Sequence, residues 1–203
     1  MRYTVAHLVN LLNEIGEAET KALLSDFSCP IAPDVEVFLH RKAAEFAKRG
    51  WAQTHLVFAP FKSELVLVAY FTLASKVMTV PSKSIPRSLK KRISAFSTYN
   101  SAIDSYCLSA PLIAQLGKNF KNDYNKLITG NELLEIACDK VSSIQLDLGG
   151  RFAYLECEDK PALVEFYKEH GFIEFDRRYL DPDETDLLSG DYLIQMLRHF
   201  RQR

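Results

Sequence analysis

The sequence predicts a mixed α/β (α+β) protein in which helices pack on a mostly antiparallel central sheet of six to seven strands. Three observations support this fold class. Apolar residues recur at helical spacing through residues 1–48. Residues 54–80 are rich in β-branched and aromatic side chains. The rest of the chain alternates strand-like and helix-like patterns, which indicates a mixed sheet with helices packed on it.

Length and composition fit a single domain over residues 1–203. Of the 203 residues, 47% are apolar, which suffices for a substantial core. The formal net charge is -1, so no global field steers the protein towards nucleic acid or a membrane. Binding of a polyanion would therefore need a local patch of basic residues.

The first elements are expected to be helical. Residues 1–26 form an N-terminal extension of two short helices, because apolar positions at helical spacing lie on either side of Gly16. A stronger helix begins at Pro33 and Asp34, buries one apolar face and ends before Gly50, a residue that suits a C-terminal cap.

A hairpin follows, with strands over 54–58 and 64–80 joined by residues 59–63. Prolines, serines and basic residues interrupt this texture over 81–109. We therefore expect residues 81–109 to be an insertion or variable loop that carries a short helix.

The next strand begins at Pro111 and exits at Gly117, where a bulge or a close backbone approach is expected. Thr129-Gly130-Asn131-Glu132 matches the capping box S/T-x-x-E and predicts the start of a helix. The remaining predicted elements are strands over 152–157, 172–175 and 192–197, and a helix over 160–170 that Gly171 ends.

The stretch from Leu163 to Phe172 has the pattern L-x-x-F-Y-x-x-x-G-F. It resembles the late helix-to-strand motif of the GNAT superfamily of N-acetyltransferases. Covering about residues 27–200, the resemblance implies a sheet that is splayed in the middle and acetyl-CoA (coenzyme A) as co-substrate. It also implies direct transfer of the acetyl group to a primary amine in a ternary complex. No metal is expected, because no His or Cys pair has ligand spacing.

Tyr167 is the candidate catalytic residue. In the GNAT family the tyrosine of this motif points at the thiol of coenzyme A, and a phenol with a pKa of about 10 can protonate the leaving thiolate. Phe166 beside it is a candidate cofactor contact. The alternative is that both belong only to an apolar stripe with Leu163 and His170, at spacing i, i+3, i+4, i+7.

The resemblance places the coenzyme A loop at residues 125–130, where the family signature is Q/R-x-x-G-x-G/A. Gly130 matches this signature, whereas Asn125 and Ile128 depart from it. Because a helix N-terminus can hold a pyrophosphate through its backbone amides, Asn125, Ile128, Thr129, Gly130 and Asn131 are candidate cofactor-binding residues. The alternative is an ordinary capped helix.

By the same resemblance, the preceding strand offers free main-chain groups to the pantetheine amides and to the acetyl carbonyl. Leu116, Gly117 and Lys118 would occupy that position. The alternative is a core strand that ends at a turn.

Glu156 is a candidate general base. Alternation along residues 152–158 places Tyr154 and Glu156 on one face of a strand, where Glu156 would line an acceptor cleft. The alternative is a solvated carboxylate at the end of a strand.

Two further functions stay open. Phe27-Ser28-Cys29 and the following helix are similar to the opening of the toxin-like GNAT branch, whose members acetylate aminoacyl-tRNA. In that case the basic residues of 83–92 would bind RNA and an antitoxin protein would neutralise the enzyme, although the same residues suit a solvated loop. The departures at Asn125 and Ile128 suggest instead a catalytically lapsed GNAT-fold binding module.

The expected setting is cytoplasmic. The four cysteines are widely spaced and resemble core residues, so reduced thiols are expected. The longest apolar run, residues 65–73, is far below the roughly 20 residues that a membrane helix needs. The main hypothesis therefore has a small-molecule or peptide amine as substrate and no membrane contact, and a homodimer is possible.

Overall fold

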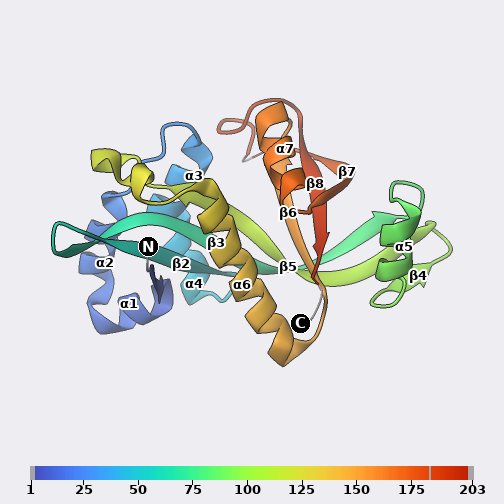
Figure 1. Cartoon of the computed structure of the whole chain (residues 1–203), viewed down its shortest axis with the longest axis horizontal. Helices are drawn as coiled ribbons and strands as arrows, with labels where there is room; N and C mark the ends of the chain where they lie inside the picture. Colours follow the sequence, from blue (N-terminus) through green and yellow to red (C-terminus); the bar gives the residue numbers. More distant parts are fainter. Residues whose placement is uncertain (1–2, 183, 201–203) are drawn as a thin grey trace. The chain divides into compact units, whose positions relative to one another are not determined.

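The computed structural model describes residues 3–182 and 184–200 (Figure 1). Within these residues, eight strands form one mostly antiparallel sheet, and helices are interspersed with the strands along the chain. The predicted fold class is confirmed, with one strand more than the expected six to seven. The chain divides into two compact units, Met1–Ala74 with Ile113–Cys138 and Ser75–Leu112 with Asp139–Arg203.

The first unit opens with β1 (Thr4–His7), α1 (Leu8–Glu14) and α2 (Gly16–Ser25). The two helices expected in residues 1–26 are confirmed, and Gly16 between them has a φ of 85°. Strand β1 was not expected. It pairs antiparallel with β2, with Thr4 opposite Phe58. Four residues are too few for a strand period to stand out beside a helix, so the pattern alone did not reveal it.

A continuous helical run follows, made of α3 (Pro33–Val37), a π-helical turn (Phe38–Lys42) and α4 (Ala43–Lys48). In the π-helical turn the N–H of Ala43 donates to the carbonyl of Phe38, five residues earlier. Gly50 follows with a φ of 71°. The expected helix after Pro33 is confirmed, and the wider turn inside it is new.

The hairpin consists of β2 (Ala52–Phe61) and β3 (Glu64–Pro81). Only Lys62 and Ser63 connect them, with φ angles of 47° and 68°. Two positive φ angles are typical of the type I′ turn, whose twist matches that of the flanking strands. The expected five-residue connection over 59–63 is therefore wrong, because the strands pair up to the turn, where Phe61 lies opposite Glu64.

Residues 81–109 contain more structure than expected. The predicted short helix is α5 (Arg87–Ile93), but β4 (Thr98–Asn100) and the start of β5 (Ser105–Lys118) also lie here. Strands β4 and β5 pair antiparallel. The first half of β5 buries Tyr106, Leu108 and Ala110 in alternation, and the serines in and around this segment disguised the pattern in the sequence.

Apart from the 3-10 helical segment Lys121–Leu127, where a polar loop was predicted, the remaining elements agree with the predictions in type and order. They are α6 (Gly130–Leu148), β6 (Phe152–Glu158), α7 (Pro161–Glu169), β7 (Ile173–Tyr179) and β8 (Tyr192–His199). Strand β8 pairs antiparallel with both β6 and β7. None of the helices in the described residues is both long and apolar enough to cross a membrane.

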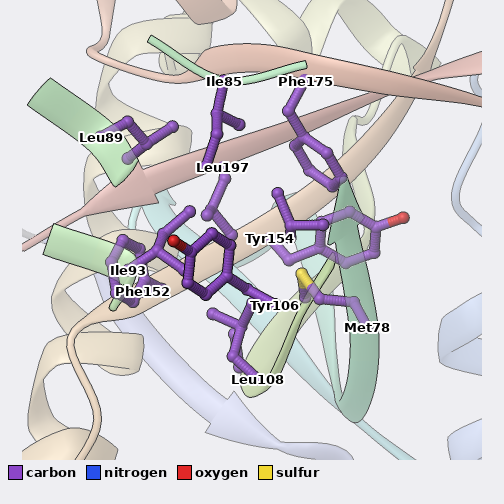
Figure 2. Packing of buried hydrophobic residues seen from close by; sticks show 12 residues of the cluster. Met78, Ile85, Leu89, Ile93, Tyr106, Leu108, Phe152, Tyr154, Phe175 and Leu197 are labelled. Carbon is purple, nitrogen blue, oxygen red and sulfur yellow. The ribbon is translucent and has the colours of Figure 1, made fainter. Parts of the chain in front are cut away.

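Each unit has its own apolar core. In the first unit the rings of Phe27 and Tyr70 meet edge to face, with centroids 5.1 Å apart. In the second unit, side chains from α5, β5, β6 and β8 pack together (Figure 2). Tyr70 is fully buried, and its hydroxyl donates to the carbonyl of Val35 at 2.6 Å.

Replacing Tyr70 with phenylalanine should lower the free energy of unfolding by roughly 1–2 kcal/mol, because the buried Val35 carbonyl loses a hydrogen bond. Urea unfolding measures this loss. Tyr99→Phe is the matched control, since Tyr99 is 49% exposed and its hydroxyl contacts Asp104 at the surface. Equal losses in the two variants would contradict the assignment.

Candidate active site

Helix α7 ends in a Schellman motif that determines where Tyr167 lies. Gly171 has a φ of 78°, and its N–H donates to the carbonyl of Lys168 at 2.9 Å. The N–H of Phe172 donates to the carbonyl of Tyr167 at 3.1 Å. The apolar contact typical of this motif is also present, with the Tyr167 and Phe172 ring centroids 5.8 Å apart. The predicted helix end at Gly171 is confirmed.

Tyr167 is buried among aromatic rings. Tyr167 is 9% exposed. Its ring also meets the ring of Phe166 edge to face, with the two centroids 5.2 Å apart. The half-buried Phe166 contacts the ring of His170 at 4.6 Å. Both the catalytic role of Tyr167 and the cofactor role of Phe166 stay predictions, since an aromatic cluster suits an apolar stripe as well.

Glu156 lies at the centre of a polar network on β6, β7 and β8. Arg178 of β7 donates to its Oε2 from Nε at 3.0 Å and from Nη2 at 2.8 Å. The hydroxyl of Tyr154 and, at 3.2 Å, the amide of Gln195 donate to Oε1. The Glu156 side chain is only 11% exposed. The sequence pattern places Tyr154 and Glu156 on one face but does not reveal Arg178 and Gln195.

This network keeps Glu156 ionised. Burial alone would raise the pKa of Glu156, but the hydrogen bonds from Arg178 and Tyr154 outweigh it and hold the pKa below its usual range. A general base needs a lone pair directed at the substrate, whereas both carboxylate oxygens already accept hydrogen bonds. The contacts of Glu156 favour a positioning role, and its role as a base stays a prediction.

Arg178 also fastens the loop between β7 and β8. Its Nη1 and Nη2 donate to the two carboxylate oxygens of Glu184 at 2.8 and 2.9 Å. Oε2 of Glu184 in turn accepts the N–H of Asp181 at 2.8 Å. One guanidinium group therefore joins the sheet to this loop. The only signal in the sequence was an arginine followed closely by acidic residues.

The candidate coenzyme A residues Asn125 to Asn131 lead into α6, and the predicted capping box is confirmed. The N–H of Thr129 donates to Glu132 Oε2 at 2.8 Å, and the N–H of Glu132 donates to Thr129 Oγ1 at 3.2 Å. Gly130 and Asn131 occupy the first two helical positions, whose N–H groups have no acceptor within the helix. Two donors at the positive end of the helix dipole are thus directed away from the helix.

Ile128, which departs from the glycine of the signature, causes no backbone strain. Its φ of -143° and ψ of 136° are those of extended chain, and its side chain is buried. The left-handed conformation lies earlier, at Asn122 and Asp123, with φ angles of 51° and 62°. Asparagine and aspartate tolerate this conformation better than other residues with a Cβ.

The end of β5 is held by side chains of the first unit. Lys118 donates from Nζ to the carbonyls of Asn125 and Ile128 at 3.2 and 3.3 Å, which orders the loop and places an ammonium group beside it. The next residue, Asn119, is 1% exposed and donates to the carbonyl of Leu67 at 2.9 Å. Leu116 is half-buried in the same strand.

Gly117 is required by close packing. A Cβ at this position would lie 2.4 Å from Cγ1 of Val35 and 3.4 Å from the ring of Phe27. The sequence predicted a bulge or a close backbone approach at Gly117, whereas the close neighbours are side chains. A role for Leu116, Gly117 and Lys118 in cofactor binding stays a prediction.

The buried thiols of Cys29 and Cys157 are poorly suited to covalent catalysis. Burial raises the pKa of Cys29 to about 11 and that of Cys157 to about 12. A thiolate nucleophile would therefore be scarce at neutral pH. Among residues 3–182 and 184–200, no group of three or more His, Cys, Asp or Glu side chains is arranged to hold a metal ion.

Comparison with known proteins shows the fold but gives no close relative. No family model matches the chain, and no curated protein matches it. Among solved structures, AtaT complexed with acetyl-methionyl-tRNAfMet is similar at a TM-score of 0.61 and 15% identity, over 95% of this chain and 94% of that one. A tyrosine-to-phenylalanine mutant of KacT is similar at a TM-score of 0.60 and 12% identity, over 96% of this chain and 94% of that one.

AtaTR bound with AcCoA is similar at a TM-score of 0.54 and 14% identity, over 95% of this chain and 91% of that one. These solved structures have the GNAT fold, and AtaT is a toxin. The chain therefore has the GNAT fold. The resemblance of its opening helix to the toxin-like branch stays a prediction, because a likeness at 12–15% identity shows the fold alone.

Replacing Arg178 with methionine should lower the free energy of unfolding at pH 7 by roughly 2–3 kcal/mol, because Glu156 would stay buried without its charged partner. The pKa of Glu156 is depressed in the folded protein, so this stabilisation is present above the unfolded value of about 4.3. It is lost as the pH falls through the depressed folded value. Urea unfolding at a series of pH values should therefore show the two proteins converging in acid.

Lys160→Met is the control for this prediction, because its ion pair with Glu158 is half-exposed on the lysine side and should contribute less than about 0.5 kcal/mol. Adding Glu156→Gln to Arg178→Met should recover part of the loss. A loss that does not depend on pH would rule out the charge pair as its cause.

Proposed function

We propose that this chain is an acetyl-CoA-dependent N-acetyltransferase whose acceptor is the α-amino group of an aminoacyl-tRNA. The observation that carries the catalytic half is Tyr167, held by the Schellman motif at the end of α7. The fold supports the acceptor half, because a protein of similar fold is complexed with acetyl-methionyl-tRNA and the similarity spans nearly its whole length. The proposed acceptor is thus the aminoacyl-tRNA of the alternative hypothesis and not the small-molecule or peptide amine of the main one.

In this proposal the amine nitrogen attacks the thioester carbonyl directly. The new C–N bond forms, the C–S bond breaks, and the thiolate of coenzyme A takes the phenolic proton of Tyr167. The proton released by the amine passes through water and restores the phenol of Tyr167, so the enzyme ends the cycle unchanged. Burial raises the pKa of the Cys29 and Cys157 thiols, and the proposal invokes no acyl-enzyme intermediate.

A strong general base is not required. The α-amino group has a reference pKa of only about 7.7–8.0, so a useful fraction is neutral near physiological pH. This agrees with the contacts of Glu156, whose oxygens are engaged by Arg178, Tyr154 and Gln195. Glu156 then orders the sheet and the 180–191 loop.

For the co-substrate, we assign the pyrophosphate of acetyl-CoA to the N-terminus of α6. The N–H groups of Gly130 and Asn131 and the helix dipole attract an anion there. Lys118 adds a positive charge while it holds the carbonyls of Asn125 and Ile128. Backbone donors do this binding, so the lost glycine of the signature is tolerated.

Replacing Gly130 with proline should weaken acetyl-CoA binding about tenfold, since it removes one N–H that contacts a charged group. Proline is favoured at the first helical position, so the free energy of unfolding should not fall. Isothermal titration calorimetry measures the affinity. Gly130→Ala keeps the N–H and serves as the control. Unchanged affinity in the proline variant would exclude this amide from the site.

Replacing Tyr167 with phenylalanine should lower kcat by about 10²–10³-fold and leave KM for acetyl-CoA within about twofold, because only the proton donor is lost. The assay follows transfer of labelled acetyl from acetyl-CoA to methionyl-tRNA. Tyr179→Phe is the control, because Tyr179 is 80% exposed. Expression of the wild-type protein should arrest growth, and the Tyr167 variant should not.

The outcomes separate the alternatives. A Tyr167→Phe variant with full activity would remove the catalytic assignment. Transfer to small amines but never to aminoacyl-tRNA would support the first hypothesis, in which the acceptor is a small-molecule or peptide amine. Binding of acetyl-CoA without transfer to any amine would indicate the lapsed binding module.

A further inference from the structure

Residues 82–103 of the second unit carry a concentrated positive charge. They include five basic residues and no Asp or Glu, although acidic residues slightly outnumber basic ones in the whole chain, at 26 to 25. We call the five residues the basic surface: Lys83, Arg87, Lys90, Lys91 and Arg92. Three of them lie on α5 beyond its first turn, Arg87 begins the helix, and Lys83 precedes it.

The opposite side of α5 holds the basic surface in place. Leu89 and Ile93, one turn apart, are 1% and 0% exposed and pack in the core of the second unit (Figure 2). Arg87 and Lys91, also one turn apart, are exposed. The helix is therefore anchored by its apolar side and presents its charges on a fixed support.

The charges are scarcely neutralised within the protein. Lys83 is 3.7 Å from Asp104 with 91% of its side chain exposed, and Lys90 contacts the neutral hydroxyl of Ser82 at 2.5 Å. In the part of the chain that the structure describes, Arg87, Lys91 and Arg92 form no ion pair. These three cations can therefore pair with an external anion.

The helix dipole explains only part of this arrangement. Lys90, Lys91 and Arg92 are in the last turn, where cations are stabilising. Arg87 instead lies at the N-terminus, where the dipole is positive, and it repels Lys91 at i+4. A cation at this position costs stability in the free protein, and an anionic partner would offset that cost.

Aromatic side chains in the same segment indicate which polyanion fits. Phe96 is 46% exposed, and the guanidinium of Arg151 lies 5.6 Å from its ring centroid. Tyr99 is 49% exposed. Unpaired bases stack on aromatic rings and guanidinium planes, whereas an acidic peptide offers only carboxylates. The combination favours RNA over an acidic protein.

We propose that the basic surface binds the phosphodiester backbone of an RNA and that Phe96 stacks on an unpaired base. This inference rests on the proposed function for the identity of that RNA as the tRNA part of the acceptor. The surface supplies affinity through phosphate contacts and does not take part in the chemistry. Its signature is a dependence on salt, because each neutralised phosphate releases counterions.

The test measures binding of fluorescently labelled, deacylated tRNA to the full chain by anisotropy across a salt series. Arg87→Gln/Lys91→Gln should weaken binding about tenfold at low salt. It should also reduce the slope of log K against log salt by about 1 for each phosphate that is no longer neutralised. Lys62→Gln/Lys140→Gln removes the same charge from exposed positions outside the basic surface and should stay within about twofold of wild type.

Wild-type affinity and slope in Arg87→Gln/Lys91→Gln would overturn the proposal, as would equal weakening in the control. A poly-glutamate peptide that displaces tRNA as effectively as unlabelled tRNA would show a site for acidic proteins instead. If wild type binds tRNA as predicted but never acetylates aminoacyl-tRNA, only the proposed function fails. If it acetylates normally while both variants bind equally, only this inference fails.

Discussion

The two backbone hydrogen bonds that close α7 on Gly171 are the constraint on which the candidate site depends. They fix the last turn of the helix and bring Phe172 against the ring of Tyr167. A side chain at a φ of 78° would be strained, so glycine is needed here although its added Cβ would meet nothing closer than 3.9 Å. Phe172 then leads into β7, whose Arg178 binds both Glu156 and Glu184. The helix end at Gly171 therefore helps to position both the hydroxyl of Tyr167 and the strand that carries Arg178.

Local features of the chain were predictable, and tertiary ones were not. The capping box of Thr129 and Glu132 and the stop at Gly171 depend on residues a few positions apart, so spacing alone reveals them. The pair of Glu156 and Arg178 spans 22 residues and depends on two strand pairings with β8 and on a bulge between Glu174 and Asp176. No period in the sequence encodes that register. The exposed face of Arg87 and Lys91 was visible as charge but not as a rigid surface.

Ile128 shows why a signature can fail while the structure behind it persists. At position 128 the family signature has glycine and this sequence has isoleucine. The backbone there is extended, a conformation that isoleucine adopts without strain. The left-handed residues lie at Asn122 and Asp123, outside the aligned signature. A site that uses main-chain N–H groups constrains the path of the chain more than its side chains. This is consistent with a shared fold at 12–15% identity when no family model matches.

The π-helical turn between α3 and α4 corrects the rotational position of the buried residues around the helix axis. Val35, Leu39, Ala43 and Ala47 are all buried and are strictly four residues apart. In a regular α-helix each such step overshoots a full rotation by about 40°, so the last alanine would face away from the first valine by about 120°. The wider turn at residues 38–42 contains extra chain per rotation and returns the alanines to the core. Removing a single residue from that turn would therefore rotate α4 about its axis and carry its small side chains into water.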